Sequence, residues 1–227
     1  MAERNLSLAT RNEETREKQT LETVIEFGLS DIKKRFDETI ADIESKFELF
    51  DSLLTAGNES SAKGILRSQI VFLESALDFY LHEISKYGFV NIFKGTWNKT
   101  ERYNNFTIPM KSIEFGLKNP ESSRWLIEYL NSRFSLEVYL SKESMKDQLN
   151  MLGLNFEPVI NKAFPGRDGK KIISNLFERR NQIAHQSDRK HANAEQNDIT
   201  KEYVVDCIKD VKILVETIQD EAIQKNT

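Results

Sequence analysis

The chain of 227 residues contains one cysteine, Cys207, together with four prolines and nine glycines. A single cysteine excludes an intramolecular disulfide and a zinc site built from several thiolates. Because all-β proteins need turn residues after every short strand, so few prolines and glycines favour helices. No run approaches the roughly twenty apolar residues of a transmembrane helix, and the first twenty residues lack the apolar core of a secretory signal. We therefore expect a helical, cytoplasmic protein with no membrane partner.

The charge of the chain is small overall but unevenly distributed. Hydrophobic residues make up 39% and charged residues 30%, which is the balance of a folded protein. A net charge of −4 argues against a general nucleic-acid coat. Residues 162–191, however, hold eight lysines or arginines and only three acids. A basic segment in an acidic protein is a candidate phosphate-binding surface, although a solvated helix face explains it equally well.

Apolar residues recur at spacings of three and four in five segments of the sequence. This period predicts long helices at 31–55, 62–86, 122–140, 170–184 and 198–224. The second is apolar around most of its circumference, so we expect it at the centre of a bundle. Residues 185–197 are polar apart from alanine and predict an exposed loop.

Residues 88–107 show no clear period and predict an irregular insertion. Their aromatic side chains either anchor the segment to the core or stack on bases: Phe93, Trp97, Tyr103 and Phe106. We therefore divide the chain into a tail and amphipathic helix, 1–57, and a helical domain, 58–227, that contains this insertion.

Polar side chains form one stripe along the otherwise apolar segment 62–86. They lie mostly four or seven residues apart and so share a helix face: Arg67, Glu74, Asp78 and His82. A buried ion pair or the wall of a groove accounts for such a stripe, and this is our interpretation of His82. Glu74 and Asp78 are also candidates for a supporting role beside the basic segment.

The residues best suited to chemistry lie in the sequence ERRNQIAHQ, at Arg180, Asn181 and His185. In a helix, Asn181 and His185 are one turn apart on one face, and the long Arg180 side chain can reach the same edge. His185 offers an imidazole, Arg180 a permanently charged guanidinium suited to phosphate, and Asn181 a neutral amide. A surface arginine followed by a helix-capping histidine is the alternative interpretation. Further phosphate contacts are expected from nearby basic residues: Arg179, Arg189, Lys190, Lys170 and Lys171.

Signatures of several other enzyme classes do not occur in the sequence. It contains no His-Glu-x-x-His zinc motif and no Gly-Lys-Ser/Thr phosphate loop. Three histidines, at 82, 185 and 191, make a poor metal-binding set. We expect neither a metal nor a cofactor.

The string Arg180-Asn181-x-x-x-His185 resembles the signature of the HEPN superfamily, and LRSQIVFLESALDFYLHEI, residues 66–84, resembles the first core helix of its RiboL-PSP-like branch. The resemblance implies a single all-α helical bundle of HEPN type, here with an N-terminal helical extension. It also implies a metal-independent endoribonuclease that acts as a homodimer, in which the motif helices of two subunits share one cleft. Catalytic roles would fall to Arg180, Asn181 and His185, and a supporting acidic role to Asp78 or Glu74. Many such proteins belong to toxin–antitoxin or antiviral defence systems, so an antitoxin or a defence protein is a candidate partner.

The chemistry of these residues agrees with RNA cleavage. Without a metal, the reaction needs a base for the 2′-hydroxyl, a proton donor for the leaving 5′-oxygen, and positive charge at the phosphorane. His185 could serve as base or acid, Arg180 could hold the non-bridging oxygens, and a symmetric dimer would supply one histidine for each task. Two alternatives stay open: a non-catalytic module of the same fold that binds RNA or a protein, and a purely structural helical protein.

Overall fold

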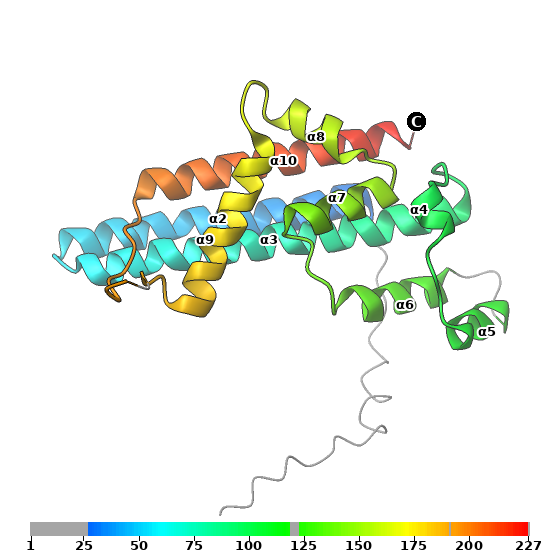
Figure 1. Cartoon of the computed structure of the whole chain (residues 1–227), viewed down its shortest axis with the longest axis horizontal. Coiled ribbons are helices and arrows are strands. Elements are labelled where there is room, and N and C mark those ends of the chain that lie inside the picture. The colour runs from blue at the N-terminus through cyan, green and yellow to red at the C-terminus, as the bar shows by residue number, and fades with distance from the viewer. Residues whose placement is uncertain (1–26, 119–122, 191, 227) are drawn as a thin grey trace, which may run out of the picture.

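The computed structural model describes residues 27–118, 123–190 and 192–226 (Figure 1). Within these residues every regular element is a helix, and the only β-type pairing is an isolated bridge between Arg189 and Gln196. The prediction of an all-α fold is confirmed. The helices of the described residues are α2 (Leu29–Thr55), α3 (Glu59–Lys94), α4 (Glu101–Asn104), α5 (Met110–Lys118), α6 (Arg124–Phe134), α7 (Lys142–Met151), α8 (Phe156–Ala163), α9 (Gly169–Gln186) and α10 (Lys201–Gln224).

Helices α2 and α3 form a long antiparallel hairpin that spans the molecule (Figure 1). Helix α2 buries the apolar stripe that its sequence predicts, including Ile32 and Phe36. Helix α3 begins after Asn58, whose side chain accepts a hydrogen bond from the backbone N–H of Ser61 at 3.2 Å. It ends before Gly95, which has a φ of 80°. It is buried on most sides, so its predicted central position is confirmed.

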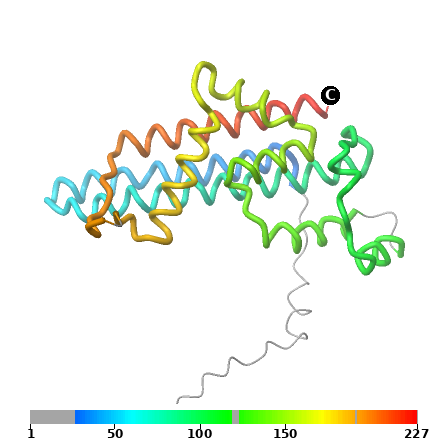
Figure 2. The backbone as a smooth tube through the Cα atoms, in the orientation of Figure 1, coloured from blue at the N-terminus to red at the C-terminus, as the bar shows by residue number. Residues whose placement is uncertain are grey.

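The C-terminal helix α10 lies along the hairpin, and α9 crosses the hairpin at a steep angle (Figure 2). A buried polar link joins the three long helices: the Tyr80 hydroxyl donates to Gln219 Oε1 at 3.0 Å, and Gln219 Nε2 donates to the Leu29 carbonyl at 2.9 Å. Helix α9 contacts the central helix α3 where the two cross. The C-terminal half of α9 therefore lies against the middle of α3. This crossing positions the candidate site.

Helix α3 continues to Lys94, well into the segment 88–107 that the sequence predicted to be irregular. A Cβ at Gly88 would lie 2.8 Å from the side chains of both Trp97 and Leu152, so the glycine lets these side chains pack directly on the helix. Trp97 is buried, and the Phe89 ring contacts Tyr103 and Phe106 at centroid distances of 5.4 and 4.7 Å. These three aromatic residues of the segment therefore anchor it to the core, whereas Phe93 is 49% exposed.

The predicted helix at 122–140 is wrong over residues 135–140, because α6 ends at Phe134. The backbone N–H of Tyr139 donates to Asp78 Oδ1 at 3.0 Å, so a side chain of α3 takes the hydrogen bond that a longer helix would have made. The connection from α6 to α7 is thereby held against the central helix.

The division of the chain between residues 57 and 58 falls at the turn of the α2–α3 hairpin. Helix α2 shares one hydrophobic core with α3 and α10, which includes Phe36, Tyr80 and Ile218. Residues 1–26 of the predicted tail lie outside the described residues. No helix of the described segments combines the length and hydrophobicity needed to cross a membrane.

Candidate functional site

Helix α9 carries the Arg-Asn-x-x-x-His motif on its last two turns. It begins after Asp168, whose side chain accepts a hydrogen bond from the backbone N–H of Lys171 at 3.0 Å. Ile173 and Leu176 are buried and fix the rotation of the helix. The helix ends at Gln186.

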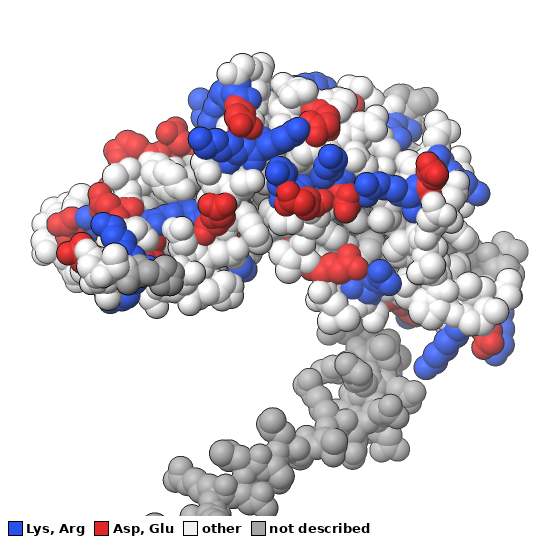
Figure 3. Space-filling model, in the orientation of Figure 1, with Lys and Arg blue, Asp and Glu red and all other residues white. Residues whose placement is uncertain are grey.

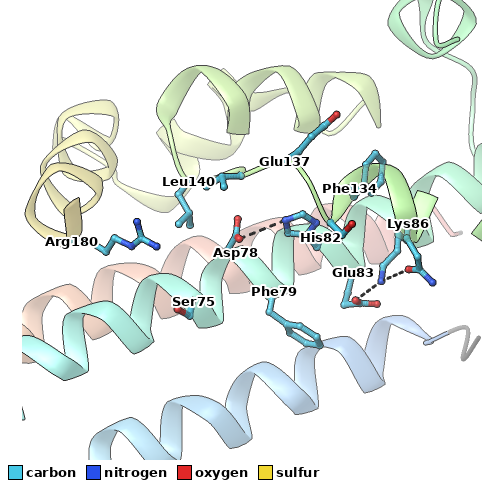
Figure 4. Close-up of a pocket in the computed structure, with 13 residues that line it drawn as sticks. Ser75, Asp78, Phe79, His82, Glu83, Lys86, Phe134, Glu137, Leu140 and Arg180 are labelled. Carbon is cyan, nitrogen blue, oxygen red and sulfur yellow. Dashed lines mark hydrogen bonds and ion pairs between the residues drawn. The ribbon is translucent and has the colours of Figure 1, made fainter. Parts of the chain in front are cut away.

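Arg180 reaches into a pocket of about 560 Å³ between α9, α3 and the α6–α7 connection (Figure 4). One terminal nitrogen, Nη1, donates to Asn181 Oδ1 at 3.0 Å. The Nε nitrogen is buried without a hydrogen-bond partner in the described part of the chain. A guanidinium held by one neutral amide is well suited to bind an entering phosphate, which accepts two parallel hydrogen bonds.

Two carboxylic acids of α3 lie close to Arg180. Glu74 is 1% exposed, and its Oε2 has no hydrogen-bond partner among the described residues. Burial raises the pKa of Glu74 to about 8, while the positive charge of Arg180 opposes this rise and the negative charge of Asp78 adds to it. Asp78 lines the pocket itself. The structure therefore brings Glu74 and Asp78 together with Arg180, although the two segments are far apart in the sequence.

His185 occupies a different position from Arg180 and Asn181. Its side chain is exposed at the end of α9, and it does not belong to the lining of the pocket. Within one subunit the structure therefore joins Arg180 to Asn181 but leaves His185 outside the pocket.

His82, for which we expected only a structural role, lines the same pocket as Arg180 (Figure 4). Its Nε2 lies 3.6 Å from Asp78 Oδ2, and its ring lies over that of Tyr139 at a centroid distance of 4.6 Å. The sequence contained one signal, because Asp78 and His82 are a helical turn apart on the polar stripe of α3. It could not indicate that this stripe faces Arg180, since that depends on where α9 crosses.

Asp188 lies in the polar loop after α9 and is fully buried. Its Oδ2 accepts a hydrogen bond from Arg67 Nε at 2.6 Å, and its Oδ1 accepts one from Asn197 Nδ2 at 3.1 Å. Arg179 donates to both carboxylate oxygens and to the Asp198 carbonyl. The prediction of an exposed loop at 185–197 is therefore wrong at this residue, because two arginines draw its carboxylate inward.

Arg179 was predicted to contact RNA, but its side chain is only 13% exposed. Both terminal nitrogens are bound to Asp188, and one of them also to the Asp198 carbonyl. Arg179 thus helps to hold the loop after α9 in place.

The basic segment 162–191 is interleaved in space with acids from other helices (Figure 3). Lys170 Nζ lies 2.7 Å from Glu157, and Arg167 is paired with Asp210 at 2.6 Å. The excess of positive charge seen along the sequence is therefore largely compensated on the surface. The Lys170–Glu157 pair is exposed, and exposed ion pairs are weak, so a phosphate can compete for Lys170.

The remaining predicted RNA contacts lie at opposite ends of α9. Lys170 and Lys171 are in its first turn, whereas Arg189 and Lys190 follow its end, about 25 Å away by the rise of an 18-residue helix. Arg189 donates to the Ala194 carbonyl at 2.6 Å within the loop. Both pairs can contact one RNA only if the strand runs along α9.

Acidic, histidine and cysteine side chains do not gather into a metal site: in the described residues no three of them are grouped so as to hold an ion. Burial raises the pKa of the Cys207 thiol to about 11. The thiol is therefore protonated and unreactive near neutral pH.

In a comparison with known proteins, the chain matches a family model. The RiboL-PSP-HEPN model matches residues 30–224, from the first turn of α2 to the end of α10. Neither the curated proteins nor the solved structures contain a match to the chain. The matched span includes the motif of α9, the polar stripe of α3 and the segment 88–107. The chain belongs to the RiboL-PSP-HEPN family.

Proposed function

We propose that the protein is a metal-independent endoribonuclease that cleaves RNA through attack of a 2′-hydroxyl on the adjacent phosphate. Its family points to a nuclease or RNA-binding role. The main observation in favour of an enzyme, rather than a binding protein, is the Arg180–Asn181 pair. It lies beside a pocket that also contains the carboxylate of Asp78. Such a pocket combines a guanidinium that can bind phosphate with polar groups that are partly buried. Electrostatic stabilisation of a phosphorane is strongest in surroundings from which water is partly excluded.

In this proposal Arg180 binds the non-bridging oxygens of the scissile phosphate and stabilises the charge that develops there. Asn181 orients the guanidinium through its hydrogen bond. Asp78 supports the site as a carboxylate, and Glu74 as a neutral acid at pH 7, because its pKa lies at about 8. Lys170, Lys171, Arg189 and Lys190 hold the RNA backbone beyond the pocket.

His185 takes part in proton transfer from the exposed end of α9. In a homodimer whose α9 helices approach each other, two His185 side chains would enter a cleft shared by both subunits. Their exposure leaves them available for such a contact. We place the enzyme in a cytoplasmic toxin–antitoxin or antiviral defence system, with an antitoxin or defence protein as its partner.

A second candidate function is a binding module that holds RNA or a protein without cutting. The position of His185 outside the pocket of one subunit favours it, because no histidine of the motif then stands beside Arg180. The two functions differ in one measurable property, which is cleavage in the absence of metal.

Cleavage of a labelled RNA in the presence of EDTA tests the proposal. We expect the purified protein to cut, and His185→Ala to lower the single-turnover rate by about 10²-fold or more, the usual contribution of a general acid or base. Arg180→Lys should lose a similar factor, because an ammonium cannot supply the planar two-point grip. Arg102→Lys is the matched control, since Arg102 is an exposed residue paired with Asp147 on the surface.

Thermal melts of all variants must match that of the parent protein before the rates are compared. If folded, dimeric His185→Ala cuts RNA at the parent rate, the catalytic assignment is wrong. If the parent protein binds RNA but does not cut it, the binding module is the correct function.

A further inference from the structure

We infer that His82, held by Asp78 in the pocket of Arg180, is the general acid that protonates the leaving 5′-oxygen of the RNA. This inference rests on the proposed ribonuclease function and adds a catalytic residue to it. Each pocket then needs only one histidine from the α9 motif, which would act as the base.

The Asp78–His82 pair has a fixed geometry. Asp78 Oδ1 accepts the backbone N–H of Tyr139 at 3.0 Å, which turns Oδ2 towards His82. Oδ2 lies 3.6 Å from His82 Nε2, close enough to stabilise an imidazolium but longer than a normal hydrogen bond. The proton on Nε2 therefore stays available to a substrate oxygen.

The ring of His82 packs against two aromatic rings and remains open to the pocket. Tyr139 and Phe134 contact it at centroid distances of 4.6 and 6.4 Å. The side chain keeps 16% of its surface exposed, and Asp78 keeps 25%. A histidine with this support is positioned but not sealed from a bound substrate.

The other charged groups around the pocket are already paired among themselves. On α3, Lys86 binds Glu83 at 2.5 Å and Asn131 at 2.9 Å. On the α6–α7 connection, Glu137 accepts from Arg133 at 3.3 Å and from the Tyr139 hydroxyl at 2.8 Å. The charges left for a substrate are those of Arg180, from α9, and of the Asp78–His82 pair, from α3.

The pocket is large enough for one nucleotide of an RNA strand. Its volume of about 560 Å³ lies within the range of roughly 300–1,000 Å³ that small-ligand sites occupy. Phe79 lines it and, being 39% exposed, offers a ring surface on which an unstacked base can pack. A nucleotide seated there would place its phosphate at Arg180.

In the proposed step one histidine takes a proton from the RNA and another gives one to it. The base, His185, removes the 2′-hydroxyl proton as the 2′-oxygen forms its bond to phosphorus. The bond from phosphorus to the 5′-oxygen breaks, and the imidazolium of His82 gives its proton to that oxygen. The products are a 2′,3′-cyclic phosphate and a 5′-hydroxyl, and solvent returns both histidines to their starting forms.

A chemically altered RNA gives the decisive test. Replacing the leaving 5′-oxygen by sulfur produces a thiolate leaving group, which needs no proton because thiols ionise near pH 8.5, whereas alcohols remain protonated. We expect His82→Gln to cut ordinary RNA at least about 10²-fold more slowly and the sulfur-containing RNA at nearly the parent rate, with RNA affinity unchanged. His185→Ala should be slow on both substrates.

His82→Phe is the matched control for packing, because it keeps a ring against Tyr139 and Phe134 but cannot donate a proton. It should be as slow as His82→Gln on ordinary RNA and equally restored by sulfur. Cleavage of ordinary RNA by His82→Phe at the parent rate would overturn the inference, as would equal impairment of His82→Gln on both substrates. If the parent protein cuts neither RNA, the proposed ribonuclease function is itself wrong and the inference fails with it.

Discussion

Among single residues, Glu74, which is buried at the candidate site, makes the stability of the fold depend on pH. Its carboxyl group is buried beside Arg180, and burial raises its pKa from the ordinary value of 4.5 to about 8. The folded state therefore binds this proton more tightly than the unfolded state does. The stability that this group contributes is fully present below about pH 4.5 and is lost as the pH rises towards 8.

We expect Glu74→Gln to remove this pH dependence, because the amide has the shape of the protonated acid and does not ionise. Between pH 5 and 8 the free energy of unfolding of the parent should fall by up to about 1.4 kcal/mol per pH unit relative to the variant. Urea denaturation at several pH values measures the difference. Parallel curves for the two proteins would show that Glu74 is ionised in the folded protein at neutral pH.

Asp188 is the second residue whose burial has a measurable consequence. Arg67 and Arg179 both depend on its carboxylate, and their side chains are 10% and 13% exposed. Asp188→Asn preserves the size of the side chain and tolerates the φ of 57° at this position. It should lower the free energy of unfolding by about 3 kcal/mol, because two nearly buried guanidinium groups lose their counter-charge.

The same substitution at Asp198 is the control. Asp198 pairs with Lys63 at 2.8 Å on the surface, with its side chain 73% exposed. Asp198→Asn should leave the urea midpoint almost unchanged. Equal effects of the two substitutions would mean that Asp188 does not hold the loop after α9 in place.

At the scale of elements, α3 contains two glycines in opposite environments. A Cβ at Gly64 meets no atom within 4 Å, whereas a Cβ at Gly88 would lie 2.8 Å from Trp97 and Leu152. Alanine favours a helix over glycine by about 1 kcal/mol at both positions. Overpacking at Gly88 costs about 1–3 kcal/mol, because Trp97 and Leu152 are themselves buried and cannot move aside.

We therefore expect opposite effects from one substitution on one helix. Gly64→Ala should raise the melting temperature, and Gly88→Ala should lower it. Differential scanning calorimetry measures both. A stabilising Gly88→Ala would contradict the close packing of Trp97 and Leu152 on the C-terminal part of α3.

At the scale of the whole molecule, the proposed mechanism needs a second subunit, because His185 does not line the pocket of its own chain. We expect a homodimer at micromolar concentration in light scattering. On dilution, the specific ribonuclease activity should fall over the same concentration range in which sedimentation shows the dimer dissociating. A monomer with full activity would refute the shared cleft.

The helical period of apolar residues was sufficient to predict most of the elements. It gave α2, α9 and α10 to within a few residues, because each buries one stripe and exposes the rest. It failed after Phe134, where Asp78 of α3 binds the Tyr139 backbone and the helix ends. Periodicity describes how one segment repeats, and it carries no information about a side chain that arrives from another helix.

The sequence alone determined the all-α fold, the central position of α3 and the family, because all three depend on patterns that are local in the chain. Which polar residues meet depends instead on how the helices pack. The crossing of α9 over α3 places Arg180 beside Glu74, Asp78 and His82, and leaves His185 outside. It also pairs the cations of the basic segment with distant acids, such as Lys170 with Glu157. Charge and proton transfer act over a few ångströms of space, and neighbours at that distance are set by packing.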